Sequence, residues 1–354
     1  MRLGLIARMD NSGLGIQTKG FYDHLNPVKT MVIDISQLEP TPERRMKQYP
    51  ERYQGDGVTF IYGIPTEGEI RAFLQDLDVV LLAESSYNMS FYQIARQMGV
   101  KTANQYNYEF FDWFGDSMWE TPDMFIAPST WHYDDVDAFC KERNLKHVYL
   151  HLPIDRSEIP RRHIDSARTF IHIAGRPAVH DRNGTYTFLN AIQLSEGALK
   201  GIVYTQNREL ADDIKRDFPM VKVVVNLHNY AEMYKKGAVL VLPRKYGGNC
   251  LPLNEALAAG MPVIMSRLSP QTDFLPAQWL VAANKTDIDF VPRTKIDVYK
   301  VSPYELMIKM LWFKSLSNQD MKEQSNKADE IADTISWETM APKYLEVLEA
   351  LCHL

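Results

Sequence analysis

The sequence predicts an α/β protein built from two doubly wound parallel sheets, and three observations lead to this prediction. Short apolar runs alternate with amphipathic helical segments along almost the whole chain. The 354 residues exceed what one hydrophobic core usually organises, so two domains are expected. A polar, proline-containing segment near residues 154–168 separates two halves of similar size. We therefore predict domains over residues 1–157 and 168–330, followed by a C-terminal helical segment, 331–354.

The apolar runs are short and bounded by turn residues, which is typical of buried strands. In the first half the expected strands are 2–8, 29–35, 58–63, 78–84, 100–106, 123–129 and 147–153. Helical spacing predicts helices over 16–25, 67–77 and 90–99. In the second half the expected strands are 169–175, 200–206, 221–227, 238–243, 262–266 and 279–283. The tail from Ser336 onward has the apolar spacing of one long amphipathic helix.

The segment RKYGGNCLPLNEALAAGMPVI, residues 244–264, is the most informative part of the chain. It predicts a basic, glycine-rich turn after a strand, and then a helix that opens near Pro252. Such a turn brings backbone N–H groups to the positive end of a helix dipole, and Arg244 and Lys245 add positive charge. A phosphate is expected to bind at this point. The backbone that would surround it belongs to Gly247, Gly248, Asn249 and Leu251.

Glu255 lies one turn inside this predicted helix. A carboxylate there would repel phosphate, but its two oxygens can accept both hydroxyls of a ribose. Phosphate and ribose sites on one strand–turn–helix unit indicate a nucleotide ligand. The alternative is that Glu255 is an ordinary acid stabilised by the N-terminal dipole of the helix.

The stretch YGGNCLPLNEALAAGMPVI resembles the nucleotide-sugar motif of retaining glycosyltransferases of the GT-B fold, in the large family 4 group. The resemblance implies two Rossmann-like domains that face each other across a cleft, and a final helix that crosses back to the first domain. It aligns Glu255 with the acid that holds the donor ribose, whereas Gly247 stands where the family has another acid. The Tyr-Gly-Gly turn is similar to glycosyltransferase-like proteins of bacteriophages and some actinobacteria. The implied co-substrate is a nucleotide-diphospho-sugar, with a UDP-sugar expected.

A second motif, residues 169–192, predicts a strand that ends at Gly175, a loop, and a helix that begins near Asn183. The loop brings Arg176 and Arg182 to the carboxyl end of a strand, where open α/β sheets place their ligands. Two guanidiniums can bind a diphosphate bidentately and stay charged at any working pH. The resemblance gives both arginines the role of gripping the donor's diphosphate. The alternative for Arg182 is a surface ion pair of little energetic value.

The uracil of a UDP-sugar is expected near Thr205 and residues 224–227, because the resemblance implies that backbone atoms hold the base. His172 and His180 flank the arginine loop. A histidine that alternates with apolar residues in a strand is more often a core residue than a ligand, so neither receives a catalytic role.

Gly13 and Gly15 lie between the first strand and the first helix. The resemblance implies a glycine-rich loop over the donor's diphosphate and sugar. The same glycines, with Asp34 about 20 residues later, make an NAD(P)-binding oxidoreductase the alternative function. That fingerprint is incomplete because Thr18 stands where a third glycine is expected. A module that binds a nucleotide-sugar without turnover is a further alternative.

The implied reaction displaces a nucleoside diphosphate from an anomeric carbon by an acceptor hydroxyl. Arg176, Arg182 and Lys245 would stabilise the charge on the leaving diphosphate without a metal. Retention of configuration is implied by the resemblance alone. Glu84 and Glu109 each follow an expected strand, so either could assist catalysis from a carboxyl strand end. The alternative for each is a helix N-terminal acid or a loop ion pair.

The acceptor is the least determined part of the prediction. The aromatic run YNYEFFDWF, residues 106–114, is a candidate platform for an acceptor sugar or an unstacked base, although most aromatic residues nearby are expected in the core. Similarity to phage proteins makes a hydroxymethylated base of viral DNA one candidate acceptor, with a virion protein and a glycan as alternatives. Arginines in 42–54 and 160–163 would contact a DNA backbone, or simply lie on a solvated surface. The net charge of −6 counts modestly against DNA.

Composition sets further limits. The three cysteines, Cys140, Cys250 and Cys352, are too few and too scattered for a disulfide framework or a zinc site. No apolar run is long enough to span a bilayer, and the first residues run into a strand instead of a signal peptide. The acidic runs 134–137 and 286–289 are interpreted as solvated acids rather than metal ligands. We therefore expect a cytoplasmic protein, in the host cytoplasm if phage-encoded, with no metal and no integral membrane segment.

Overall fold

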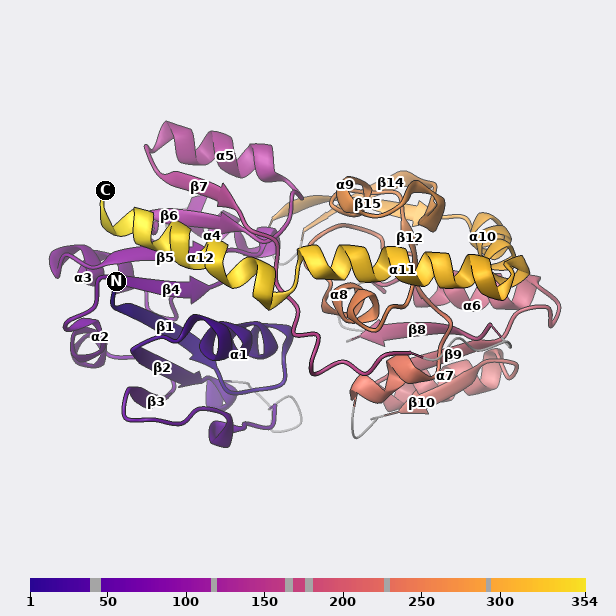
Figure 1. Cartoon of the computed structure of the whole chain (residues 1–354), viewed down its shortest axis with the longest axis horizontal. Helices are drawn as coiled ribbons and strands as arrows, with labels where there is room; N and C mark the ends of the chain where they lie inside the picture. Colours follow the sequence, from indigo (N-terminus) through magenta and orange to yellow (C-terminus); the bar gives the residue numbers. More distant parts are fainter. Residues whose placement is uncertain (39–45, 116–119, 163–167, 176–180, 226–229, 291–293) are drawn as a thin grey trace. The chain divides into compact units, whose positions relative to one another are not determined.

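The computed structural model describes residues 1–38, 46–115, 120–162, 168–175, 181–225, 230–290 and 294–354. The chain divides into two compact units. Unit 1 comprises Met1–Pro153, Pro292–Thr294 and Trp337–Leu354, and unit 2 comprises Ile154–Val291 and Lys295–Ser336. Each unit is a parallel sheet with helices packed on it (Figure 1).

Unit 1 contains a seven-stranded parallel sheet in the order β3-β2-β1-β4-β5-β6-β7. Every strand expected in the first half of the sequence is present. The strands are β1 (Leu3–Arg8), β2 (Lys29–Asp34), β3 (Val58–Tyr62), β4 (Val79–Ala83), β5 (Lys101–Gln105), β6 (Met124–Ala127) and β7 (Lys146–Tyr149). The central strand β4 is apolar and buried throughout because helices cover both faces of the sheet.

The helices of unit 1 follow local signals in the sequence. The α-helices are α1 (Gly13–Leu25), α2 (Glu67–Leu74), α3 (Phe91–Gln97), α4 (Asp112–Gly115), α5 (Tyr133–Glu142) and α12 (Trp337–Cys352). Short 3₁₀ turns occur at Ser36–Leu38 (η1), Pro50–Arg52 (η3) and Tyr108–Phe110 (η4). Thr66 and Glu69 form a capping box that starts α2, and the Ser12 hydroxyl accepts from the Gly15 amide to start α1.

The C-terminal helix α12 belongs to unit 1, where it packs on α1. The Trp337 ring meets Phe21 edge to face, with ring centroids 5.7 Å apart. A Cβ at Gly20 would lie 2.8 Å from the Trp337 ring, so this glycine lets the two helices approach closely. Trp337, Tyr344 and Leu348 are buried in the core on this face of the sheet. The apolar stripe of the tail is therefore explained by burial against the first helix.

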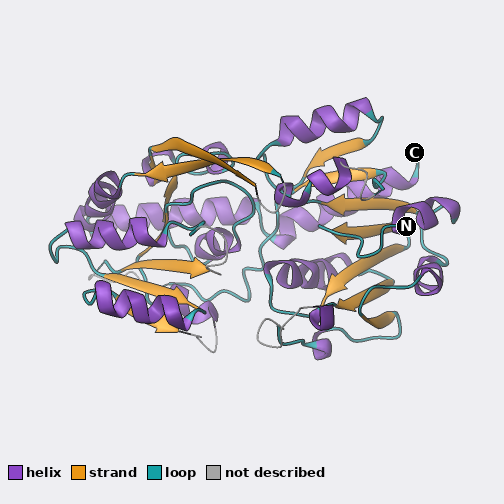
Figure 2. Cartoon of the chain, turned by 180° about the vertical axis from the view of Figure 1, so that it is seen from behind, coloured by secondary structure: helices purple, strands orange, loops and turns teal. Residues whose placement is uncertain are grey.

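Unit 2 contains a six-stranded parallel sheet in the order β10-β9-β8-β11-β12-β13. Its strands are β8 (Phe170–Gly175), β9 (Gly201–Thr205), β10 (Lys222–Val225), β11 (Val239–Leu242), β12 (Val263–Ser266) and β13 (Leu280–Val281). Its helices are α6 (Thr185–Leu194), α7 (Arg208–Asp217), α8 (Leu251–Ala258), α9 (Gln271–Phe274), α10 (Pro303–Ser315) and α11 (Asn318–Thr334), with 3₁₀ turns η5 (Tyr230–Lys235) and η6 (Ala277–Trp279). Figure 2 shows the same elements from behind. Every strand expected in the second half is also present.

An antiparallel ribbon in unit 2 was not expected from the sequence. It pairs β14 (Ala283–Phe290) with β15 (Lys295–Val301). Residues 284–288 are exposed, and Lys285 forms an ion pair with Asp297 at 2.7 Å. A bulge between Lys285 and Asp287 interrupts the alternation of side chains. The segment TDID lies on this ribbon, and its described side chains up to residue 288 are exposed, in agreement with the interpretation of its acids as solvated.

In both sheets the strand order reverses beside the first strand of the unit. The reversal lies between β1 and β4 in unit 1, and between β8 and β11 in unit 2. Open α/β sheets bind their ligands outside the carboxyl ends of the strands at such switch points. Most of the residues singled out in the sequence follow these four strands, whereas Glu109 follows the neighbouring strand β5 and Thr205 ends the neighbouring strand β9.

Candidate functional site

Two arginines hold the loop after β11, residues 243–250, by its carbonyl groups. Arg182 donates from Nη2 to the Gly247 carbonyl at 2.8 Å, and Arg244 donates from Nη1 to the Gly248 carbonyl at 3.1 Å. Because the N–H of a trans peptide points opposite to its carbonyl, the amides of Gly248 and Asn249 are directed away from the arginines. Gly248 has φ +88°, a conformation that favours glycine. The loop thus presents backbone N–H groups just before α8 begins.

Arg244 supports the loop from inside the protein. Its exposed fraction is 3%, and its carbonyl accepts from the Ser266 hydroxyl at 2.6 Å. The sequence suggested that Arg244 adds charge beside a bound phosphate, but this burial makes it a residue that shapes the loop. Lys245 is half-buried, and its amide donates to the Arg182 carbonyl at 2.9 Å. Arg182 also lies 4.7 Å from the centre of the Tyr246 ring.

The helix after this loop carries Glu255. Leu251 is its first residue and Pro252 its second, where the missing N–H of proline costs nothing. Glu255 is 4% exposed, and its Oε2 accepts from the Tyr234 hydroxyl at 2.5 Å. Burial raises the pKa of Glu255 to about 7, against the opposite effect of the Tyr234 hydrogen bond. Tyr234 comes from η5, and nothing in the sequence around it signalled this contact.

The loop after β8 joins the same switch point. The Asp181 carboxylate caps α6 by accepting from the amides of Thr185 at 2.7 Å and Tyr186 at 3.2 Å. Gly184 precedes the helix with φ +73°, and a Cβ there would lie 2.3 Å from the Pro243 carbonyl. Only glycine allows this approach of the two loops. The observed helix begins at Thr185, two residues after the expected start.

His172 is a fully buried residue that links three elements of unit 2. Its Nδ1 donates to the Val241 carbonyl at 2.7 Å, and its Nε2 pairs with the Thr185 hydroxyl at 3.0 Å. Burial lowers the pKa of His172 to about 4, so the ring is neutral at physiological pH. This bonding agrees with the interpretation of His172 as a core residue.

Some of the expected donor-binding residues lie outside the described part of the chain. Arg176 and His180 fall in residues 176–180, and the end of the expected uracil segment falls in residues 226–229. Thr205 is described: it lies opposite Gly175 in the sheet, and its hydroxyl accepts from the Asn207 amide at 3.1 Å. The structure therefore brings Arg182, Lys245, Gly247, Gly248, Asn249, Leu251 and Glu255 together, with Thr205 two strands along the same sheet edge.

The structure shows what the glycines in the first loop of unit 1 do. Gly13 opens α1, and a Cβ at Gly15 would lie 2.0 Å from the Asp10 carbonyl. Gly15 is therefore required by the close approach of the helix to the loop after β1. Asp34, the acid of the dinucleotide alternative, is buried and accepts from the Ser36 amide at 2.7 Å.

The two candidate catalytic acids lie at the carboxyl ends of neighbouring strands, β4 and β5. Glu84 is half-buried, and its Oε2 accepts from the Asn107 amide at 2.5 Å. Burial raises the pKa of Glu84 to about 7, and the negative charge of Glu109 adds to this effect. Glu109 is 6% exposed, and its carbonyl accepts from the Thr294 hydroxyl at 3.0 Å.

The aromatic run splits between core and edge. Tyr106, Phe111 and Phe114 are buried in the core of unit 1. Tyr108 is half-buried and stacks on His132, with ring centroids 4.0 Å apart. Phe110 and Trp113 are half-buried and meet edge to face at 5.0 Å. Only part of the run thus remains for contact with an acceptor.

The described arginines of the two basic clusters each contact other groups of the protein. Arg161 forms an ion pair with Asp329. Arg162 is buried, and its Nε donates to the Gly260 carbonyl at 2.7 Å. In the other cluster, residues 42–45 lie outside the described part, and the Arg52 guanidinium lies over the Tyr49 ring at 4.2 Å. Arg162 is therefore used inside unit 2, whereas Arg161 lies on the surface in an ion pair.

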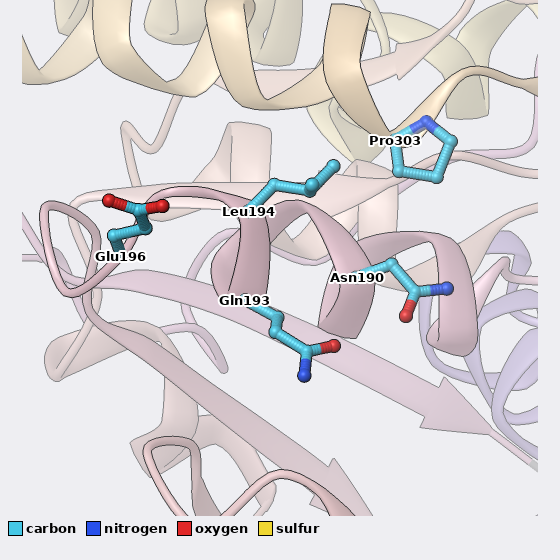
Figure 3. A pocket seen from close by; sticks show the side chains of 5 residues that line it. All are labelled: Asn190, Gln193, Leu194, Glu196 and Pro303. Atoms are coloured by element: carbon cyan, nitrogen blue, oxygen red, sulfur yellow. The ribbon is translucent and has the colours of Figure 1, made fainter.

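An open hollow of about 370 Å³ lies elsewhere on unit 2 (Figure 3). Its lining consists of Asn190, Gln193, Leu194, Glu196 and Pro303. Asn190, Gln193 and Leu194 lie at the C-terminal end of α6, and Glu196 follows that helix. Pro303 is the first residue of α10. Because the N-terminus of α6 is the end that meets the arginine loops, this hollow is separate from the switch point of unit 2.

No described helix is both long and apolar enough to cross a membrane. No group of three histidine, cysteine, aspartate or glutamate side chains that could hold a metal ion was found in the part of the chain that the structure describes.

Comparison with known proteins identifies the fold. No protein-family model and no curated protein sequence matches the chain. Among solved structures, HepE of Anabaena in complex with UDP matches with a TM-score of 0.71 and 9% identity, over 99% of this chain and 100% of that one. A glycosyltransferase from Rickettsia africae matches with a TM-score of 0.68 and 11% identity, over 99% and 98%. Sucrose-phosphate synthase from Thermosynechococcus elongatus matches with a TM-score of 0.65 and 12% identity, over 99% and 98%.

At these identities the likeness shows the fold. The chain has the two-domain α/β GT-B fold of these glycosyltransferases, and the predicted fold class is confirmed. None of the structures named here is an oxidoreductase, so they lend no support to the NAD(P) alternative.

Proposed function

We propose that this protein is a glycosyltransferase that moves a sugar from a UDP-sugar to an acceptor hydroxyl. The observation that carries the proposal is the arrangement at the switch point of unit 2. There the loop of residues 243–250, Arg182 and the N-terminus of α8 meet, with Glu255 one turn further. The GT-B fold supports the proposal, since proteins of this fold include HepE, solved with UDP and with UDP-glucose.

In this proposal the loop and the start of α8 bind the donor's diphosphate. The amides of Gly248 and Asn249 point away from the arginines, and the dipole of α8 adds a partial positive charge. Lys245 supplies a full charge, and Arg182 both shapes the loop and contributes charge. Arg176 lies outside the described residues, and its proposed contact with the diphosphate rests on the sequence motif alone. These groups need no metal to neutralise a diphosphate.

Glu255 is proposed to bind the ribose, in a different manner from the one that the sequence suggested. Tyr234 already donates to Oε2, so Oε1 is the oxygen for a ribose hydroxyl, and Oε2 retains one lone pair. With a pKa near 7, a substantial part of the Glu255 population is protonated at neutral pH. Donor binding then favours the ionised form, because a carboxylate accepts both hydroxyls.

Transfer forms a bond between the acceptor oxygen and the anomeric carbon and breaks the bond from that carbon to the β-phosphate oxygen. The electron pair of the broken bond leaves with UDP. Negative charge therefore grows on the diphosphate, where fixed cations and helix N-termini are most effective in the transition state. Retention of configuration is part of the proposal and rests on the resemblance of the donor motif.

We propose a glycan or protein hydroxyl as the acceptor in preference to a hydroxymethylated base in DNA. Residues 102–140 contain eight acids and no lysine or arginine. The described acids of this stretch include Glu109 and Asp112, in the segment that follows β5, and Asp134, Asp135 and Asp137 on α5, and their negative charge disfavours a phosphate backbone. Arg161 and Arg162, which would have contacted that backbone, are engaged within unit 2.

A donor screen tests the proposal. We expect calorimetry to show binding of UDP-sugars in preference to GDP-, ADP- and TDP-sugars, and slow release of UDP with water or small glycosides as acceptors. A protein that binds none of these nucleotide-sugars contradicts the proposal. Binding without release of any nucleotide diphosphate, across glycoside, protein and DNA acceptors, would instead favour a non-catalytic module. Binding of NAD(P) would restore the oxidoreductase alternative.

A further inference from the structure

The ribbon of β14 and β15 is hydrogen-bonded to the loop of residues 243–250. The N–H of Tyr299, in β15, donates to the Lys245 carbonyl at 2.7 Å. The ribbon is a two-stranded sheet, so β15 has an outer edge whose backbone groups lie outside its ladder with β14. One N–H group of that edge holds the loop. Two segments far apart in the sequence are thus joined where we propose that the diphosphate binds.

The main chain of Lys245 is held on both sides. Its N–H donates to the Arg182 carbonyl at 2.9 Å, and its carbonyl accepts from Tyr299. Because peptide planes are rigid and both of these are bonded, the direction in which the Lys245 side chain leaves the backbone is set. A lysine side chain has much rotamer freedom to lose when it binds an anion, and a fixed backbone leaves less to be ordered.

The neighbouring carbonyls of the loop are held in another way. Those of Gly247 and Gly248 accept from arginine side chains of unit 2. These two hydrogen bonds do not involve the ribbon. Loss of the Tyr299 hydrogen bond would therefore release Lys245 first and leave the amides that follow the two glycine carbonyls in place. The geometry in this way separates the two contributions of the loop, its amides and its lysine.

We infer that the N–H of Tyr299 positions Lys245 for the donor's diphosphate, which makes the ribbon a part of the donor site. The inference rests on the proposed glycosyltransferase function, and both residues belong to unit 2. A cation that is already in place needs no reorganisation as charge grows on the leaving diphosphate. Tyr299 is a positioning residue, because it acts through Lys245.

An ester in place of one amide tests a single N–H group. Incorporation of the α-hydroxy acid analogue of tyrosine at position 299 replaces the N–H by oxygen and keeps the side chain. We expect calorimetry on the full chain to show that affinity for UDP falls about fivefold to tenfold, since one backbone hydrogen bond is lost. The same ester at Tyr304 is the matched control. That amide lies in the first turn of α10, where N–H groups have no partner within the helix, so UDP affinity should stay that of the wild type.

Substitution of Lys245 distinguishes positioning from a general loosening of the loop. In Lys245→Ala the ester at Tyr299 should have no further effect on UDP affinity, because the group that it positions is absent. In Lys245→Arg, which keeps the charge, the ester should again weaken binding severalfold. An ester that lowers affinity equally in the wild type and in Lys245→Ala would overturn the inference. Wild-type affinity in the ester variant would overturn it as well.

Hydrogen exchange of the Tyr299 amide decides the case even if the ester prevents folding. Coupling between two sites is reciprocal, so saturating UDP should slow this exchange in the wild type and leave it unchanged in Lys245→Ala. Equal slowing in both proteins, or none in the wild type, would overturn the inference while leaving the proposed function in place. Failure of the wild type to bind UDP or any UDP-sugar would count against the proposed function instead, and calorimetry reports that separately.

Discussion

The switch points of the two units share a topology and differ in charge. In unit 2 the loops after β8 and β11 gather Arg182, Arg244 and Lys245, and the two arginines donate to the carbonyls of Gly247 and Gly248. In unit 1 the loops after β1, β4 and β5 gather Asp10, Glu84 and Glu109, with Arg8 paired to Asp10. The order of strands determines where a ligand binds in an α/β sheet, whereas the loop residues determine which ligand it is. Cations suit a diphosphate, and a half-buried acid suits a hydroxyl.

The largest effect is expected from removing a cation of unit 2. Arg182→Ala removes both the charge and the hydrogen bond to the Gly247 carbonyl. We expect kcat to fall about 100-fold while donor affinity falls less, because the diphosphate gains charge only as the bond breaks. Steady-state kinetics and calorimetry with UDP-glucose measure the two effects. Arg216→Ala, which changes an exposed arginine on α7, is the control. An equal loss of affinity with normal kcat would reduce Arg182 to a binding residue.

The next effect tests Glu255, the acid that we propose binds the donor's ribose. Glu255→Gln should weaken UDP binding by about 1.5–3 kcal/mol at pH 8, because a charge-assisted hydrogen bond to the ribose is lost. Wild-type affinity should rise through pH 7 as Glu255 ionises, and the variant should show no such rise. Calorimetry at several pH values measures both. Equal affinity of the two proteins for UDP and for its 2′,3′-dideoxy analogue would remove Glu255 from the site.

Glu255 should also change how the free energy of unfolding of the ligand-free protein depends on pH. Its pKa in the folded protein, about 7, exceeds the usual 4.5, so the folded state binds the proton more tightly than the unfolded state. The contribution of Glu255 to the free energy of unfolding therefore falls as the pH rises from 4.5 to about 7. In Glu255→Gln this fall should be absent. Urea unfolding of both proteins at pH 5 and pH 8 checks the sign.

A smaller effect is expected from Tyr234→Phe, which keeps Glu255 and removes its hydrogen bond. That bond lowers the pKa of Glu255, so the variant should hold more of the protonated form at pH 7. We expect UDP affinity at pH 7 to fall by about 1 kcal/mol and to recover toward the wild-type value at pH 8.5. A loss that persists at high pH would mean that Tyr234 contacts the donor or shapes the site in another way.

The smallest effect is predicted for added salt. If the acceptor is a glycan or protein hydroxyl, transfer should change only slightly between 50 and 200 mM salt, because few ionic contacts are formed. A DNA acceptor with six or more phosphate contacts would lose about a thousandfold in affinity over this range. Sugar transfer into hydroxymethylcytosine-containing DNA, unmodified DNA and a protein extract measures the difference. Steep salt dependence with label only in the modified DNA would reverse our choice of acceptor.

The fold could be predicted because its signal is local. Alternating apolar strands and helices are visible in windows of ten residues, and the strands of both sheets were anticipated. The ribbon of β14 and β15 was missed because residues 284–288 of its first strand are exposed and mostly polar. The apolar residues of β15, Ile296 and Val298, alternate with polar ones over too short a stretch to indicate a strand without a recognisable partner.

The candidate site was predicted in part. The glycine-rich turn with Glu255, and Arg182 in the preceding loop, could be found because each lies in a motif of consecutive residues. Tyr234 and Asn107 could not, because each acts through a side-chain contact with a residue 21 or 23 positions away. The burial of Arg244 was also invisible, since a basic residue before a turn usually remains in solvent. Contacts between distant segments depend on how the sheet is assembled, which periodicity does not encode.

The packing of α12 against α1 has a consequence for synthesis of the protein. Unit 1 takes its strands from residues before 154 and its covering helix from residues after 336, so the ribosome makes most of unit 2 in between. At 5–20 residues per second this interval lasts roughly 10–40 s. During that time Phe21 and the adjoining face of the sheet lack Trp337 and Tyr344. Unit 2, apart from the ribbon tip, is one continuous stretch of chain and can complete its core first, while the unit translated earliest waits for the last helix and offers chaperones an apolar surface.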